Sequence, residues 1–233
     1  MRRSYRILSA LLAALLCAAP ALAADSAAPT AAPIPTVLTA SAAQGGALHL
    51  DLSRDLAGFA PLLADYPQGE EAFYELDVSR QPIPIAGAGF GLCLTGNNHS
   101  DDLFLGACRL LEGLPPETPC VFTVTLRIAT NVDGGLVGIG GSPGSSVFFK
   151  CGITAAEPRR EVADGYYRLT LDKGNQGQDG PDMALIGNLE KDDTKAPGQY
   201  EWKTLTCRLS AAPDALGRAY LSFGIDSGFE GLS

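Results

Sequence analysis

The segment CVFTVTLRIAT, residues 120–130, decides the fold. Apolar side chains occupy every second position after Cys120, at Phe122, Val124, Leu126 and Ile128, and mostly polar side chains lie between them. Successive side chains of a β-strand point to opposite faces, so this period of two predicts a long strand with one buried face and one wet face.

The same period recurs along most of the chain after residue 47. Shorter apolar segments lie at 48–52, 72–78, 90–94, 103–110, 136–140, 146–150, 166–171, 183–187, 200–209 and 219–225. Many of the 27 Gly and 16 Pro residues separate them. The one helical pattern, over 53–63, is interrupted by Gly58 and Pro61, so it predicts at most a short helix. We therefore predict an all-β two-sheet sandwich, with the jelly roll as the favoured form and little or no helix outside the leader.

The N-terminus has the pattern of an export leader. Three arginines within the first six residues precede an apolar run over 7–19, and the small-residue pattern Ala21-Leu22-Ala23 follows. This arrangement predicts a secretory signal peptide at 1–23 and therefore a periplasmic or secreted protein. The run is too short to cross a bilayer as a helix, so we predict no transmembrane segment.

The next segment, 24–46, consists mainly of Ala, Pro, Ser and Thr, and Asp25 is its only charged residue. Such a composition buries too little apolar surface to offset the entropy lost on ordering. We predict a disordered linker over 24–46 and a single β-sandwich domain over 47–233.

The charge balance excludes one class of partner. The chain has 17 basic and 26 acidic residues, a formal net charge of −9. Nucleic-acid binding depends on clustered Lys and Arg that neutralise phosphates. We therefore predict no nucleic-acid partner.

Five cysteines follow the leader: Cys93, Cys108, Cys120, Cys151 and Cys207. An odd number cannot pair completely, and spacing does not fix the connectivity of one or two disulfides. Buried free thiols are the other interpretation. The chain has no C-x-x-C motif, which disfavours a zinc site, and the identity of any metal stays open.

No catalytic residue is predicted. Residues 140–144, GGSPG, match the letters G-x-S-x-G, but a strand-like segment follows and no His lies after Ser142, so we interpret them as a turn. Glu75 and Asp77 resemble the start of a two-carboxylate glycosidase strand, but Arg80 stands where the second Glu is needed. A small glycan hydrolase or lyase nevertheless remains an alternative.

The loop at 96–102 is the first candidate ligand site. Its hydrogen-bonding side chains are those of Asn97, Asn98, His99, Asp101 and Asp102, among others. Carboxylates and amides suit both sugar hydroxyls and a structural calcium ion, the one cofactor that these residue types suggest. The competing interpretation is a solvated turn whose side chains bond to their own backbone.

A second set of candidates is aromatic or acidic. Trp202 shares a strand face with Tyr200 and polar residues, and exposed rings stack on the C–H faces of sugars. The competing interpretation places this sole Trp in the core. Asp226, Phe229 and Glu230, in a second polar segment, complete the candidate ligand-binding residues.

Five motifs in order carry a family resemblance: ADYP at 64–67, GNNHSDDLF at 96–104, IATN at 128–131, GIGGSPG at 138–144 and DSGFEG at 226–231. Together they resemble a family of uncharacterised exported bacterial β-sandwich proteins, similar in plan to the jelly rolls of carbohydrate-binding modules. The resemblance implies this fold and no assigned activity. It also implies a further strand after the last motif, whereas this chain stops at Ser233, which leaves open whether a final strand is missing.

The leading hypothesis is an exported, non-enzymatic binding module that recognises glycan or another envelope component. The glycan hydrolase or lyase is the first alternative, and a structural or assembly protein of the envelope is the second. The sequence leaves the ligand and the oligomeric state open.

Overall fold

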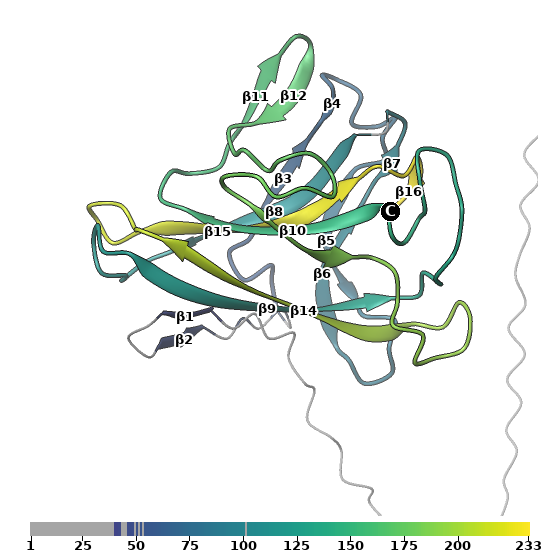
Figure 1. Cartoon of the computed structure of the whole chain (residues 1–233), viewed down its shortest axis with the longest axis horizontal. Helices are drawn as coiled ribbons and strands as arrows, with labels where there is room; N and C mark the ends of the chain where they lie inside the picture. The colour runs from purple at the N-terminus through teal and green to yellow at the C-terminus, as the bar shows by residue number, and fades with distance from the viewer. Residues whose placement is uncertain (1–39, 43–45, 49, 51, 53, 101) are drawn as a thin grey trace, which may run out of the picture. The chain divides into compact units, whose positions relative to one another are not determined.

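The computed structural model describes residues 40–42, 46–48, 50, 52, 54–100 and 102–233. Within these residues the chain forms β-strands and no helix, which confirms the all-β prediction, and no helix among them could span a membrane. The strands are β1 (Ala40–Ala42), β2 (Gly46–Leu48), β3 (Ala60–Ala64), β4 (Tyr66–Pro67), β5 (Asp77–Pro82), β6 (Phe90–Thr95), β7 (Asn97–Asn98), β8 (Leu103–Leu111), β9 (Cys120–Thr130), β10 (Val147–Thr154), β11 (Arg160–Ala163), β12 (Tyr166–Leu169), β13 (Ala184–Asn188), β14 (Glu201–Ala211), β15 (Ala219–Ser227) and β16 (Gly231–Leu232) (Figure 1). The predicted signal peptide, the predicted linker up to residue 39, and Asp101 lie outside the described residues.

The strands form several antiparallel sheets. A five-stranded sheet has the order β13-β10-β15-β8-β3, and a four-stranded sheet has the order β14-β9-β1-β2. Smaller sheets have the orders β11-β12-β4, β16-β7 and β5-β6. Figure 1 shows β9 and β14 as one layer beneath the layer that contains β10 and β15.

Strand β9 has the bounds and the faces that its sequence predicts. It pairs with β14 along its whole length, from Cys120 opposite Ala211 to Thr130 opposite Glu201. The side chains of Phe122 and Val124 are each 1% exposed, whereas Thr123 between them is exposed. The period of two therefore predicted both the element and its buried face.

The main hydrophobic core lies between β9 and the five-stranded sheet. It unites Phe122 and Val124 of β9 with Val147 of β10 and with Leu221 and Ile225 of β15. Burial of this apolar surface is the dominant force that holds the two layers together.

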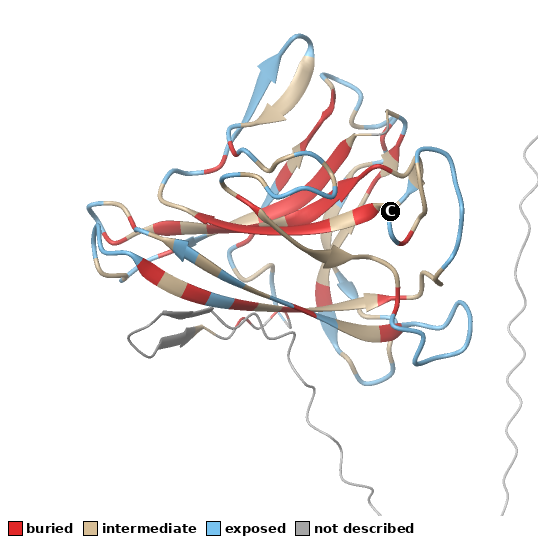
Figure 2. Ribbon diagram, viewed as in Figure 1, coloured by how far each residue is buried: buried red, intermediate tan, exposed pale blue. Residues whose placement is uncertain are grey.

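The five-stranded sheet is buried on its other face as well. A second apolar cluster joins Leu62, Phe104, Leu171 and Met183 across β3, β8 and the residues that flank the loop 172–182. Figure 2 accordingly shows nearly continuous burial along β8, β10 and β15. This double covering places even polar residues of these strands out of contact with solvent.

Three predicted segments differ in the structure. Residues 136–140 form a loop rather than a strand, because Gly135 and Gly140 both have φ of 71°, a conformation that interrupts extended backbone. The segment 72–78 turns at Glu75, where φ is 51°, before β5 begins. The interrupted helical pattern over 53–63 forms no helix among its described residues, and its last residues, from Ala60, start β3.

Candidate functional site

A cleft of about 660 Å³ lies beside β9 and is the candidate binding site. Residues 126–132, the second half of β9 and its continuation, form one part of its wall, and residues 91–95 of β6 form another. Phe149 of β10 and Phe223 and Ile225 of β15 add apolar surface from the five-stranded sheet. Leu232 of β16 lines it as well, so residues of four sheets bound the cleft, which is continuous with the main core.

Aromatic and polar side chains also line this cleft. Trp202 lies on the face of β14 that carries the exposed Thr204 and Thr206, as predicted, and the guanidinium of Arg127 lies 4.3 Å from the Trp202 ring centroid. Tyr200, which is 40% exposed, lines the cleft as well. The sole Trp is therefore part of a cleft wall, with one ring face occupied by a cation.

The lining is almost free of ionisable side chains. Among the described residues that line the cleft, Arg127 is the one charged side chain, and none is Asp, Glu, His or Lys. Glycoside hydrolysis needs two carboxyl groups that flank the scissile bond. This cleft does not supply such a pair from its side chains.

The loop 189–200 borders the cleft and is held by two buried charges. Lys191 Nζ lies 2.7 Å from Asp133 Oδ1 and donates to the carbonyl oxygens of Lys195 and Ala196. Glu201 accepts hydrogen bonds from the backbone N–H groups of residues 192 and 195 and from the hydroxyl of residue 194. These contacts fix the loop that carries Leu189 and Tyr200 to the cleft wall.

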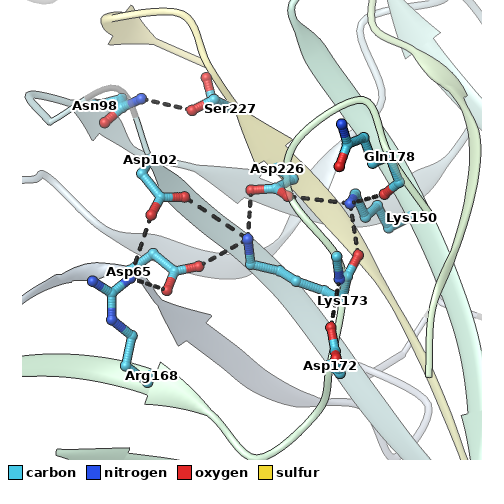
Figure 3. A network of polar contacts seen from close by, with 11 residues as sticks. Asp65, Asn98, Asp102, Lys150, Arg168, Asp172, Lys173, Gln178, Asp226 and Ser227 are labelled. Carbon is cyan, nitrogen blue, oxygen red and sulfur yellow. Dashed lines mark hydrogen bonds and ion pairs between the residues drawn. The ribbon is translucent and has the colours of Figure 1, made fainter. Parts of the chain in front are cut away.

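A second polar feature lies on the other side of the five-stranded sheet, and we call it the ionic cluster (Figure 3). It consists of Asp65, Asp102, Lys150, Arg168, Lys173 and Asp226. Oxygens of the three carboxylates lie within 4.8 Å of one another, which is the spacing of a cation site. Lys173 Nζ lies among them, 2.9 Å from Asp226 Oδ1 and 3.1 Å from Asp65 Oδ2.

Lys150 occupies the most buried position of the ionic cluster. Its side chain is fully buried, 3.4 Å from Asp226 Oδ2, and its ammonium donates to the carbonyl oxygens of Lys173 and Gln178, each at 2.6 Å. Burial lowers the pKa of Lys150, although Asp226 opposes the shift. Two backbone acceptors and a carboxylate thus compensate for the loss of hydration.

The positive charges of Arg168 and Lys173 balance the negative charges of Asp65 and Asp102. Arg168 donates to Asp65 at 2.7 Å and to Asp102 at 3.3 Å. Burial, and then the charge of Asp65, raise the pKa of Asp102. Burial lowers the pKa of Lys173, but the attraction of Asp226 and Asp65 outweighs it, so that the pKa of Lys173 is raised overall.

The formal charges of the ionic cluster cancel, since three carboxylates face three cations. The Lys173 ammonium supplies the positive charge that a calcium ion would bring, and a calcium ion among these oxygens would have to displace it. The residues present therefore do not fit a calcium site as they stand.

The structure brings the two predicted polar segments together, and Asn98 joins them. Its amide nitrogen donates to the carbonyl oxygens of Ser227 and Phe229 at 2.9 and 3.0 Å, and its amide oxygen accepts from the N–H of Ser100. Asn98 is only 1% exposed. Asn98, Asp102 and Asp226 thus make internal contacts, and none of them lines the cleft.

The other predicted residues near these segments are also engaged. Asn97 donates to Glu75, and the ring of His99 stacks on Phe73 with centroids 4.1 Å apart. Phe229 packs against Gly138 and leaves no room there for a side chain. The backbone N–H of Glu230 donates to the carbonyl oxygen of Ile139. Asp101 lies outside the described residues, and Trp202 lies apart from this group, at the cleft.

The sequence reasoning missed Lys150, Lys173, Asp65 and Arg168, as well as the cleft. The sequence does contain one signal for Lys150, since Lys150 is the one charged residue within the otherwise apolar segment 147–153. A charge inside a strand that is buried on both faces requires a buried counter-charge. The sequence does not show which carboxylate supplies it.

No protein-family model matches the chain, and no curated protein is significantly similar to it. The resemblance to exported β-sandwich proteins therefore stays a prediction.

Proposed function

We propose that this chain is an exported, non-enzymatic binding module that holds a component of the cell envelope in the cleft beside β9. The observation that carries the proposal is the cleft itself. Its volume of about 660 Å³ falls in the range of roughly 300–1,000 Å³ that ligand sites occupy. Its lining is predominantly apolar with a few polar side chains, the usual composition of such sites.

The proposed architecture is a two-sheet sandwich of the jelly-roll kind. The layer of β9 and β14 shares its core with the five-stranded sheet, which supports this arrangement. In such sandwiches rigid sheets position the surfaces that bind ligands.

The absence of acidic side chains from the described cleft lining favours binding over hydrolysis. Asp65, Asp102 and Asp226, the carboxylates that do converge, are neutralised by cations in the ionic cluster. They are therefore poor candidates for the free acid and base that the hydrolase alternative requires.

A glycan is the second candidate ligand, and Trp202 is the observation that favours it. Trp202 and Tyr200 offer rings, and Arg127 and Asn131 offer hydrogen-bonding groups, on the same stretch of wall. Sugar hydroxyls need polar partners, however, and most of the remaining lining is aliphatic or aromatic. The geometry consequently favours a ligand with an apolar face that enters the cleft.

Intrinsic fluorescence can test the proposal, because Trp202 is the only Trp in the sequence. The apolar dye anilinonaphthalene sulfonate should bind the folded chain saturably and quench Trp202 by energy transfer. Leu92→Asp, in the cleft wall, should abolish this binding, whereas Leu216→Asp, at an exposed position outside the cleft, should not. Ala129→Phe, which narrows the cleft without adding charge or a second Trp, is a second variant that should also weaken binding, so that the test does not depend on the folding of the Leu92→Asp chain alone.

Two results would contradict the proposal. The first is dye binding that Leu92→Asp and Ala129→Phe both leave unchanged in chains with a native circular dichroism spectrum. The second is the release of reducing ends when the purified chain is incubated with envelope polysaccharide, which would favour the hydrolase. Export is tested separately by N-terminal sequencing of the mature protein, which should begin at Ala24.

A further inference from the structure

Lys150 and Asp226 are diagonal neighbours in the five-stranded sheet. β10 pairs with β15 so that Asp226 lies opposite Phe148, two residues before Lys150, and the two side chains therefore share a face of the sheet. Gly224 lies opposite Lys150 and places no side chain between them. Lys150 Nζ lies 3.4 Å from Asp226 Oδ2, and both side chains are 0% exposed (Figure 3). An amine and a carboxyl group are thus held together where solvent does not reach.

The hydrogen bonds of Lys150 suit a neutral amine. Its Nζ donates to the carbonyl oxygens of Lys173 and Gln178, each at 2.6 Å. A neutral amine has two N–H bonds and one lone pair, so the two carbonyls accept both hydrogens and the lone pair is left for the third neighbour, Asp226. Burial lowers the pKa of Lys150 against the attraction of Asp226, which makes the neutral, nucleophilic form easier to reach.

The two oxygens of Asp226 differ in their partners. Oδ1 accepts a hydrogen bond from Lys173 Nζ at 2.9 Å. Oδ2, which faces Lys150, accepts no hydrogen bond from the described part of the chain. Burial works against the charged form of Lys173, but the attraction of Asp226 and Asp65 raises its pKa overall, so Lys173 stays an ammonium. One oxygen of Asp226 is therefore polarised by a fixed positive charge, while the other is in position to leave.

We propose that Lys150 and Asp226 condense within the folded chain into an isopeptide bond, an amide between the two side chains. A proton first passes from the Lys150 ammonium to Asp226 Oδ2, which gives an amine and a carboxylic acid. The amine nitrogen then attacks Cγ, and the Lys173 ammonium stabilises the negative charge that develops on Oδ1. A second proton moves from the nitrogen to Oδ2, which leaves as water. The Nζ–Cγ bond forms, the Cγ–Oδ2 bond breaks, and no oxidant, reductant or co-reactant is consumed.

Burial and fixed geometry both favour this product. A buried ion pair has lost the hydration of two charges, and the amide removes both charges from the interior. Well-oriented intramolecular groups react as if at an effective concentration of about 10⁵–10⁸ M. The rest of the ionic cluster stays balanced, because two carboxylates and two cations remain in it. The bond would join the neighbouring strands β10 and β15 within the five-stranded sheet.

A second buried lysine provides a matched control. The side chain of Lys191 is 1% exposed, lies 2.7 Å from Asp133 Oδ1 and also donates to two carbonyl oxygens. The side chain of Asp133, however, is 28% exposed, and its Oδ2 accepts a hydrogen bond from the N–H of Gly198. The hydrogen bond from Lys191, together with that from Gly198, lowers the pKa of Asp133. Asp133 therefore stays an ionised carboxylate in contact with water, and Lys191 should form no amide with it.

Mass spectrometry of the purified chain tests the inference. After reduction and denaturation, the chain should be lighter by one water than its own sequence requires, and a tryptic digest should contain a branched peptide that joins residues 150 and 226. Lys150→Met should restore the full mass. Lys191→Met, which also removes a buried cation, should keep the loss of water. The branched peptide is sought in the natural chain, so the result does not depend on the folding of either variant.

The isopeptide bond is overturned if the natural chain keeps its full mass, both as purified and after prolonged incubation at neutral pH. It is also overturned if the loss of water maps to Asp179-Gly180, a pair that can lose water by forming a succinimide, or to a link made by Lys173. Persistence of the loss in Lys150→Met leads to the same conclusion. Neither Lys150 nor Asp226 lines the cleft, so these results are independent of the proposed function.

Discussion

The ammonium nitrogen of Lys150 and a carboxylate oxygen of Asp226 lie 3.4 Å apart, and neither side chain is exposed to solvent. The two residues come from the neighbouring strands β10 and β15, at the centre of the five-stranded sheet. Lys150 also binds two carbonyl oxygens of the loop 172–182. The pair therefore joins the sheet to a loop that has no regular structure of its own.

Lys150→Met is expected to destabilise the fold by about 3–5 kcal/mol, the usual cost of removing one partner of a buried ion pair. The substitution leaves the carbonyl oxygens of Lys173 and Gln178 without their donor and reduces the positive charge around Asp226. Urea unfolding monitored by circular dichroism measures the loss. Glu157→Gln, at the exposed pair with Arg159, is the control and should cost less than about 1 kcal/mol. Equal stabilities of the two variants would refute a stabilising role for Lys150.

The stability of an Asp102→Asn variant should depend on pH in a defined direction. The pKa of Asp102 is raised by burial and by Asp65, so the folded state binds the proton more tightly than the unfolded state. Its contribution to stability is present in acid and is lost as the pH rises through the folded pKa. Asp102→Asn should therefore gain stability relative to the natural chain as the pH rises above the unfolded pKa of Asp, about 3.9, and through the raised folded value.

Asp214→Asn should show the opposite dependence and is the matched control. The backbone N–H of Arg218, together with its guanidinium, lowers the pKa of Asp214. Stability from this carboxylate is present above its unfolded pKa and is lost as the pH falls through the folded value. The variant should lose stability relative to the natural chain near pH 7 and little in acid. Parallel pH profiles for the two variants, from thermal unfolding, would contradict both assignments.

Asn98→Ala should be far more damaging than Asn97→Ala, although the residues are adjacent. Asn98 satisfies two buried carbonyl oxygens, and each group left unsatisfied costs about 1–3 kcal/mol. Asn97 makes one partly exposed side-chain hydrogen bond, to Glu75, so its loss should cost less than about 1 kcal/mol. Chemical denaturation of the two variants compares them directly. A similar loss for both would show that Asn98 does not hold the two polar segments together.

The sequence predicted features that depend on neighbouring residues better than features that depend on residues far apart in the chain. The period of two in 120–130 is local, and it sufficed to predict β9 and its buried face. The segment 136–140 has similar apolar letters, but Gly140 and the preceding Gly135 adopt positive φ, and Leu136 and Val137 are exposed. Composition alone did not distinguish a strand from a glycine-rich loop.

The candidate site was less predictable because its parts are far apart in the chain. The cleft combines residues 91–95, 126–132 and Trp202, and no local pattern shows that these segments share a wall. Asp102 and Asp226 were chosen as ligand-binding residues because their segments are polar. Their roles in the ionic cluster depend on Lys173, whose segment looked like an irregular loop.

Cys151 and Cys207 are expected to form a disulfide when the folded chain is incubated with glutathione disulfide. They lie on β10 and β14, in facing layers, Cys207 packs against the core cluster that contains Cys151, and each thiol is the main influence on the pKa of the other. This contact raises the pKa of the buried Cys151 and lowers that of Cys207, so Cys207 supplies the thiolate nucleophile.

The reaction proceeds by two exchanges and needs no other oxidant. The Cys207 thiolate attacks glutathione disulfide and releases one glutathione, and the sulfur of Cys151 then attacks Sγ of Cys207 and releases the second. Two protein thiols are thereby oxidised and one glutathione disulfide is reduced. Peptide mapping by mass spectrometry should find the Cys151–Cys207 link, and the other cysteines should remain alkylatable after unfolding. Cys108→Ser should leave the link intact, whereas Cys207→Ser should abolish it; recovery of both Cys151 and Cys207 as free thiols from the oxidised natural chain would show that the two sulfurs do not meet across the core.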